Sequence, residues 1–165
     1  LYRMLDAIHS CPAPVVCAVH GFALGGGSGL VAAADVAVAH PDATFGFTEV
    51  RLGLIPAVIS PFVLAKIGAA ARRYFVTGER FGADVALRIG LVSEISDEPG
   101  ETAEEIVASI LAGGPEAVHA AKRLTLDRPG APEVAQIAAI RRTSDEGQDG
   151  LLAFLERRAP GWVEI

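Results

Sequence analysis

A cluster of glycines constrains this chain more than any other feature. Residues 15–30 read VVCAVHGFALGGGSGL, in which a short apolar run passes through glycines into an alanine-rich helical pattern. Glycine allows a positive φ and lets a ligand approach backbone N–H groups closely. A helix that starts there adds unpaired N–H donors and the positive end of a dipole. The segment therefore predicts a backbone site for an anion, or for an oxygen that becomes negative during a reaction.

The composition narrows the class of partner. The chain has 165 residues, of which 51% are hydrophobic, which predicts a globular protein with a substantial core. Its net charge is −6 and it has no basic block, so we expect neither nucleic acid nor a membrane surface as a partner. No apolar run reaches the roughly eighteen residues of a membrane span, and residues 1–10 do not resemble a signal peptide, so we expect a cytoplasmic location.

Cysteine and histidine give no sign of a metal site. Cys11 and Cys17 lack the spacing of a zinc site or a redox motif, and Cys17 lies in an apolar run, which favours a buried reduced thiol. The spacing of the histidines is not typical of metal ligands either. We therefore expect no bound metal.

Hydrophobic periodicity predicts a mixed α/β part followed by an all-helical part. Strands are predicted at 15–19, 35–39 and 91–95, with a short extended piece at 44–47. Helices are predicted at 1–8, 30–34, 62–67, 69–75, 83–89, 102–111, 115–126, 133–142 and 150–158. Glu49 falls on a stretch without regular structure, which favours a functional role for it.

Three known sequence motifs are alternative interpretations of the glycine cluster. A Walker-type phosphate loop needs a lysine after its last glycine, and none is present. A nucleophile elbow needs glycine at Leu30, so Ser28 is interpreted as a helix-start residue. A dinucleotide fingerprint fits residues 27–32, with Glu49 as its acidic residue, but the predicted strand ends well before Gly27, which disfavours this interpretation.

Four segments in one order carry a family resemblance. They are GFALGGGSGL from Gly21, FGFTEVRLGLIP from Phe45, FVTGERFGADVALRIGLVSEI from Phe75 and FLERRAPGW from Phe154. Together they resemble the enoyl-CoA hydratase/isomerase (crotonase) family. Residues 49–68 are similar to its methylglutaconyl-CoA hydratase-like subgroup.

The resemblance implies an α/β fold, a crotonase-like spiral of ββα units with a helical C-terminal trimerisation region. Residues 1–96 would form the C-terminal part of the spiral core, with its glycine-rich oxyanion loop. Residues 97–165 would form the oligomerisation region of a homotrimer or hexamer.

The resemblance also implies roles for individual residues. The backbone N–H of Gly26 would be one of two oxyanion donors to the thioester carbonyl of an acyl-CoA, each worth about 3 to 4 kcal/mol. Glu49 would be the catalytic carboxylate that exchanges a proton with the carbon chain. The expected substrate-binding residues are Ala23, Leu24, Gly25, Gly29 and Ala57. No cofactor is implied, because coenzyme A is part of the substrate.

The surroundings of Glu49 in the sequence suit proton transfer. Its apolar neighbours, among them Phe47 and Val50, would disfavour the charged form of the carboxyl group. Two plainer interpretations stay open: Glu49 is a helix N-terminal carboxylate, or it pairs with Arg51. For the glycines, the plainer interpretation is close packing of a strand against a helix.

The chain departs from the family pattern in two ways. Gly29 stands where the family usually carries a second catalytic glutamate. A further N-terminal half, which supplies the other oxyanion donor, is expected to be lacking, so we expect weak activity from this chain alone. The favoured function is hydration of a 2-enoyl-CoA; the alternatives are double-bond isomerisation and a non-catalytic acyl-CoA-binding or assembly subunit.

A few further polar residues were considered as contacts to the substrate. His20 precedes the loop and is interpreted as either a substrate contact or, in preference, a turn or core histidine. The pairs Arg72–Arg73 and Arg157–Arg158 suit phosphate oxygens, but solvated helix faces are the commoner role of such pairs.

Overall fold

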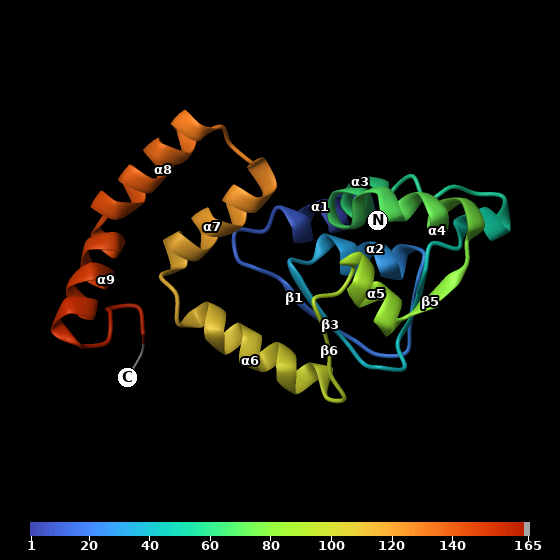
Figure 1. The fold of residues 1–165 in the computed structure, drawn as a ribbon, viewed down its shortest axis with the longest axis horizontal. Coiled ribbons are helices and arrows are strands. Elements are labelled where there is room, and N and C mark those ends of the chain that lie inside the picture. The colour runs from blue at the N-terminus through green and yellow to red at the C-terminus, as the bar shows by residue number, and fades with distance from the viewer. Residues whose placement is uncertain (164–165) are drawn as a thin grey trace. The chain divides into compact units, whose positions relative to one another are not determined.

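The computed structural model describes residues 1–163 (Figure 1). By its internal contacts the chain divides into two compact units. The first contains residues 1–11 and 15–106, and the second contains residues 12–14 and the chain from 107 onward. The division falls inside the helix α6 (Pro99–Leu111), whereas the sequence placed a boundary at 96–97.

The first unit is built on two small sheets. Parallel strands in the order β1-β3-β6 form one sheet, with bounds Val16–Val19, Val36–Ala39 and Glu94–Ile95. The other has the order β2-β4-β5, with bounds Phe22–Leu24, Thr44–Gly46 and Arg80–Gly82; β2 and β4 are parallel and β5 is antiparallel to β4. Consecutive strands enter different sheets, β1 and β2 before the helix α2 (Gly26–Ala33) and β3 and β4 after it. This alternation gives the expected ββα repeat.

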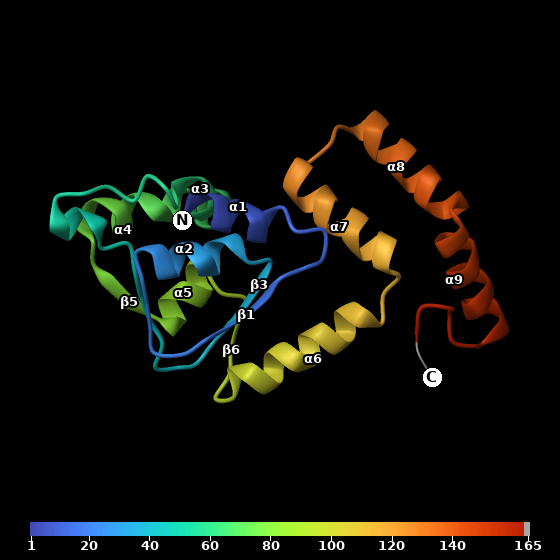
Figure 2. The same ribbon diagram turned by 180° about the vertical axis from the view of Figure 1, so that it is seen from behind.

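Short helices complete the first unit. Their bounds are α1 (Tyr2–His9), α3 (Ser60–Ile67), α4 (Ala71–Thr77) and α5 (Ala83–Ile89), with the single turns η1 (Glu49–Leu52) and η2 (Gly68–Ala70). α1 and α3 pack against α2, and Figure 2 shows the same arrangement from behind. α2 is therefore held between other helices and the sheets.

The core of the first unit lies around α2, β4 and α3. Phe45, Phe47, Ile59 and Val63 are almost completely buried, and each such side chain contributes about 1.5 to 3 kcal/mol relative to exposure. The ring of Phe47 meets that of Phe75 edge to face, with centroids 5.1 Å apart. These contacts fix the end of β4 from which η1 begins.

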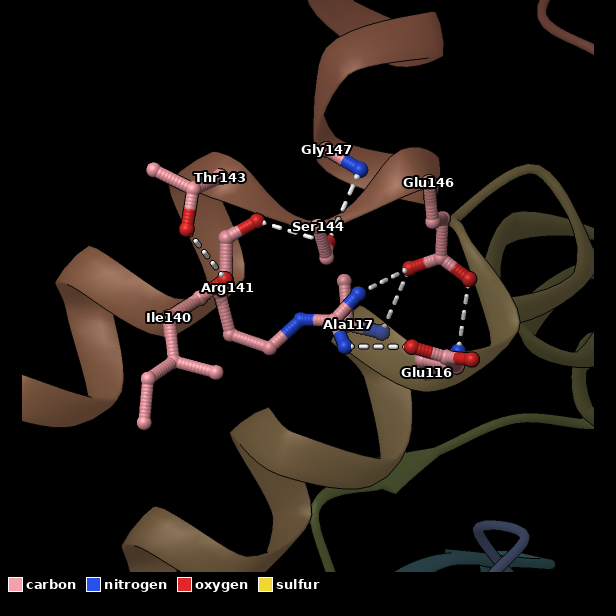
Figure 3. Close-up of polar contacts among 8 residues, drawn as sticks. All are labelled: Glu116, Ala117, Ile140, Arg141, Thr143, Ser144, Glu146 and Gly147. Carbon is pink, nitrogen blue, oxygen red and sulfur yellow. Dashed lines mark hydrogen bonds and ion pairs between the residues drawn. The ribbon is translucent and has the colours of Figure 1, made fainter.

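The second unit contains three helices, α7 (Pro115–Asp127), α8 (Ala131–Thr143) and α9 (Asp145–Glu156). The carboxylate of Glu146 accepts hydrogen bonds from the backbone N–H groups of Glu116 and Ala117, at 2.9 and 2.8 Å, and so caps α7. Arg141 donates to Glu146 and Glu116, as Figure 3 shows. This network ties the start of α7 to the α8–α9 corner.

The end of the second unit folds back onto α9. Asp149 accepts hydrogen bonds from the Arg158 guanidinium and from the N–H of Gly161, both at 2.7 Å. The Trp162 indole N–H donates to the carbonyl of Ala112 at 3.2 Å. The FLERRAPGW segment thus has a structural role as the closing turn of the helical unit.

Most predicted elements agree with the structure, but α9 begins at Asp145 instead of Gly150, and Glu49 lies in the single turn η1 instead of a stretch without regular structure. β2 and β5 were not predicted, because three-residue strands next to glycine leave no measurable alternation. α2 begins at Gly26 rather than near Leu30, because its position after β2 overrides the low helix propensity of glycine. The predicted strand over 91–95 is paired only at Glu94–Ile95.

No helix within residues 1–163 is long and apolar enough to cross a membrane.

Candidate active site

The site forms where β2 passes into α2 and β4 passes into η1. Gly25 joins β2 to α2 with φ of 53°, a conformation that glycine adopts without strain. Its N–H donates to the carbonyl of Gly46 at 2.8 Å, which joins the two strand ends. The register of β2 and β4 pairs Leu24 with Gly46. The glycine turn and Glu49, three residues beyond Gly46, therefore lie at one edge of the sheet.

Ser28 fixes the glycine turn from inside the protein. Its side chain is fully buried, and its hydroxyl donates to the carbonyl of Ala23 at 2.5 Å and accepts from the N–H of Gly46 at 3.3 Å. Ser28 is the third residue of α2, as its interpretation as a helix-start residue predicted, and its hydroxyl bridges β2 and β4 instead of capping the helix. Sequence patterns missed this role because its partners are distant backbone groups.

The N–H of Gly26, to which the resemblance assigns an oxyanion donor role, is unpaired in the described part of the chain. Gly26 is the first residue of α2, and its N–H meets no acceptor within residues 1–163. Such first-turn groups lack intrahelical partners and carry the positive end of the helix dipole. A Cβ at Gly26 would come within 3.3 Å of the Leu1 side chain, so space beside this donor is limited.

Glu49 places its carboxylate beside this turn. Its Oε1 lies 3.2 Å from the position that a Cβ on Gly25 would occupy, so the carboxylate lies against the residue that precedes Gly26. Its Oε2 is buried and has no hydrogen-bond partner within the described part of the chain. Buried carboxylate oxygens are rarely left without a partner, so this atom indicates a place for a ligand or water.

Of the two plainer interpretations of Glu49, the structure agrees with a helix N-terminal carboxylate and not with a pair with Arg51. Glu49 is the first residue of η1, as the helix N-terminal interpretation required. No ion pair joins it to Arg51 in the region the structure describes.

Gly29 lies in a space that is already filled. A Cβ at this position would be 2.4 Å from Cγ2 of Ile59 and 3.6 Å from Cδ1 of Leu5. Both of these side chains are buried. At the position where the resemblance implies a second glutamate, the space is thus occupied by the apolar side chain of Ile59, a residue that the sequence did not single out.

The remaining predicted substrate-binding residues lie at the ends of elements. Ala23 is buried in β2, and Leu24 ends that strand beside Gly46. Ala57 is exposed in the turn before α3, and its carbonyl accepts a hydrogen bond from the Ser60 hydroxyl.

Lys66 holds the far end of α2. Its ammonium group donates to the carbonyls of Val31 and Ala34, at 3.3 and 2.5 Å, which lie in the last turn of the helix. Burial lowers the pKa of Lys66, while the carboxylate of Asp35 acts in the opposite sense. Burial raises the pKa of the nearby Cys17 thiol. α2 is thus anchored at both ends.

Several of the polar residues named from the sequence have contacts of their own. The His20 ring stacks on that of His40, with centroids 5.6 Å apart. Arg73 pairs with Glu79, and Arg158 with Asp149 and Glu156, so these two arginines have protein partners. Within residues 1–163 no group of three or more potential ligand side chains is arranged to hold a metal ion.

Comparison with known proteins shows the family to which this sequence belongs. Residues 1–164 fit the family model described as Enoyl-CoA hydratase/isomerase. The chain belongs to the enoyl-CoA hydratase/isomerase family. The short-chain-enoyl-CoA hydratase of Clostridium acetobutylicum is 34% identical over 96% of this chain and 63% of its own length.

Solved structures of the enoyl-CoA hydratase/isomerase family share the fold. A Legionella pneumophila protein described as an enoyl CoA hydratase/isomerase (crotonase) is 39% identical with a TM-score of 0.92, over 98% of this chain and 66% of its own. An enoyl-CoA hydratase from Shewanella pealeana is 37% identical with a TM-score of 0.91, over 98% of this chain and 64% of its own. The crotonase fold is thereby confirmed. The chain spans about two thirds of the length of these relatives.

Proposed function

We propose that this chain provides the proton-transferring carboxylate and one oxyanion donor of an enoyl-CoA hydratase. One observation carries the proposal: Glu49, with a buried unpaired oxygen, lies against Gly25, and the next residue, Gly26, presents an unpaired N–H. A carboxylate beside a preorganised donor suits reactions in which negative charge develops on a carbonyl oxygen while a proton moves.

Gly26 would act on the thioester carbonyl. As water adds to C3 of a 2-enoyl-CoA, the electrons of the double bond move toward the carbonyl oxygen, which becomes enolate-like. The N–H of Gly26 would donate to that oxygen, with the dipole of α2 behind it. This donor is backbone, so it is fixed before the substrate arrives.

Glu49 would handle the proton. Its carboxylate would accept a proton from the attacking water as the oxygen bonds to C3, and would return a proton to C2. The product is a 3-hydroxyacyl-CoA, and Glu49 ends the cycle in its original state. One carboxylate is sufficient for this balance.

A double-bond isomerase is the second candidate, and the contact at Gly29 favours it. Because Ile59 fills the space beside Gly29, no second carboxylate is available there to position water. A single carboxylate can remove a proton from one carbon and return it to another. Of the two reactions, we favour hydration, because two relatives that match almost the whole of this chain are named enoyl-CoA hydratases.

The substrate and assembly follow as parts of the same proposal. We propose that the substrate is an acyl-CoA thioester, whose acyl chain can be branched as in methylglutaconyl-CoA. We also propose a cytoplasmic location. We also propose a homotrimer or hexamer, supported by apolar side chains of α9 that are exposed in the single chain, Phe154 at 82% and Leu155 at 74%. No metal or separate cofactor is required by the proposed chemistry.

The experiment compares the wild-type protein with Glu49→Gln, using the loss of the conjugated enoyl thioester as the signal and short and branched 2-enoyl-CoA substrates. We expect the variant to lose about 10²- to 10⁴-fold in kcat, because general acid–base catalysis contributes about that much. Glu101→Gln, which removes an exposed carboxylate of α6, is the matched control and should retain full activity.

Product analysis separates the candidates. A 3-hydroxyacyl-CoA product supports the hydratase, and a shifted double bond supports the isomerase. A wild-type protein that binds acyl-CoA without turnover would overturn both and identify a binding subunit. Equal, non-zero rates for the wild type and Glu49→Gln would overturn the role proposed for Glu49.

A further inference from the structure

A cavity lined by charged residues lies beside η1. It measures about 510 Å³ and opens to solvent between η1, the end of α4 and β5. Its lining residues are Thr48, Arg51, Leu52, Gly78, Glu79 and Arg80. Glu49 is absent from this lining, although its neighbour Thr48 is part of it, so the cavity is distinct from the candidate active site.

Two positive charges in the cavity have no partner. Neither Arg51 nor Arg80 forms a hydrogen bond or ion pair with any residue of the described chain. The chain as a whole carries a net charge of −6, so two unpaired guanidinium groups on one cavity contrast with the rest of the molecule.

The single carboxylate of the cavity is already engaged. Arg73 donates to both oxygens of Glu79, at 2.5 and 3.3 Å. The hydrogen bond from Arg73 lowers the pKa of Glu79, and the charge of Arg51 adds a smaller contribution in the same direction. Glu79 is therefore ionised at neutral pH and largely neutralised by Arg73, which leaves the cavity positive.

The backbone holds the two arginines in place. Gly78 is buried with φ of 59°, and a Cβ there would lie 2.9 Å from Val50 and 3.2 Å from Nε of Arg51. The Arg51 side chain therefore lies directly against the Gly78 backbone. The antiparallel pairing of β5 fixes the backbone of Arg80 opposite Gly46 of β4, and Cγ of Arg80 lies 3.5 Å from the position that a Cβ on Gly46 would occupy.

We propose that this cavity binds a phosphate-class oxyanion through the guanidinium groups of Arg51 and Arg80, with the hydroxyl of Thr48 as a further donor. Planar guanidinium groups match the oxygen spacing of phosphate and bind it by paired hydrogen bonds. The anion is either free phosphate or a phosphate group of a coenzyme A ligand, and the two share this chemistry. The bound anion would contact η1, the turn that carries Glu49, from a site separate from the proposed reaction.

Titration calorimetry with inorganic phosphate, at constant ionic strength, tests the proposal without any catalytic assay. We expect saturable binding of phosphate to the wild-type protein. For Arg51→Met and for Arg80→Met the dissociation constant should rise roughly tenfold or more, since each variant loses a charge-assisted pair of hydrogen bonds. Both side chains are exposed, and methionine retains the apolar stem, so folding should be unchanged. Arg72→Met, an exposed arginine of α4 outside the cavity, is the matched control.

Coenzyme A and pantetheine form the second arm. Binding of coenzyme A that depends on Arg51 and Arg80, with no binding of the phosphate-free pantetheine, assigns the cavity to a phosphate of the coenzyme. Arginine-dependent binding of inorganic phosphate alone assigns it to the free anion. The proposal is overturned if phosphate does not bind saturably, or if Arg72→Met weakens binding as much as the cavity variants do. Because these readouts are binding constants, they are independent of whether Glu49 is catalytic.

Discussion

At the scale of single residues, Ser28 shows how a side chain outside the chemistry sets the geometry of the site. Its hydroxyl joins the carbonyl of Ala23 to the N–H of Gly46, and these groups flank the turn at Gly25. The conformation at Gly25 determines the direction of the Gly26 N–H and the space that is available to the Glu49 carboxylate. The proposed oxyanion donor thus depends on a buried hydroxyl that touches no substrate in the proposed reaction.

Ser28→Ala is expected to lower the free energy of unfolding by about 1 to 3 kcal/mol, because it leaves buried backbone groups without their partner. Urea denaturation measures the change. Ser60→Ala is the control, because it removes an exposed hydroxyl bonded to the carbonyl of Ala57 and should cost much less. Equal losses in the two variants would contradict the role assigned to Ser28.

Asp149 gives the protein a predictable response to acid. Hydrogen bonds from Gly161 and Arg158 hold its pKa below the ordinary value of 3.8. As pH falls below that value, the unfolded chain takes up the proton first, so this carboxylate's contribution to stability is lost on acidification. The contribution is fully present above pH 3.8 and disappears as pH falls through the folded-state pKa.

The stability difference between the wild type and Asp149→Asn should therefore be largest near neutral pH and shrink in the acid range. Urea denaturation at a series of pH values measures it. Asp145→Asn, also on α9 but exposed and outside the contact with Arg158, should show no such trend. A difference that stays constant from neutral pH into strong acid would refute the assignment.

At the scale of elements, α2 is positioned by contacts along its whole length. Gly29 allows the helix to lie close to Ile59, and Lys66 binds the carbonyls at its C-terminal end. Small residues on this helix, among them Ala32 and Ala33, are buried for the same reason. The glycine-rich start of α2 therefore combines the two sequence interpretations, because it presents an unpaired donor and also permits close packing.

The contact between Gly29 and Ile59 predicts a coupled pair of substitutions. Gly29→Ala should destabilise the protein by about 1 to 3 kcal/mol, because its methyl group overlaps Cγ2 of Ile59. In the Ile59→Ala background the same change should cost much less, because the space is open. A double-mutant cycle from thermal or urea unfolding measures the coupling, and simple additivity would show that the overlap is relieved elsewhere.

At the scale of the whole molecule, the sequence predicted what depends on local patterns. Helices such as α5 and α7 agree closely with their predicted ranges, because apolar periodicity and proline or glycine boundaries define them. The resemblance of four ordered segments predicted the crotonase fold, which the comparisons confirm. The role of Glu49 and Gly26 stays a prediction, supported by their placement at one sheet edge.

What the sequence could not predict are features made by residues far apart in the chain. The filling of the space at Gly29 by Ile59 depends on packing of α3 against α2, and the role of Ser28 depends on the register of β2 and β4. The cavity of Arg51 and Arg80 forms because β5 pairs with β4, and β5 is too short to leave a pattern. No local motif records such neighbours.

The overlap at Gly29 also limits how this protein can evolve. A mutation that introduces a carboxylate at position 29 meets Ile59 in the folded protein, so it is selected against unless residue 59 has already become smaller. A smaller residue at 59, taken alone, opens a cavity and gains no chemistry. Each single change on the way from glycine at 29 and isoleucine at 59 to a protein with two carboxylates is therefore unfavourable. The two positions are expected to change together or not at all.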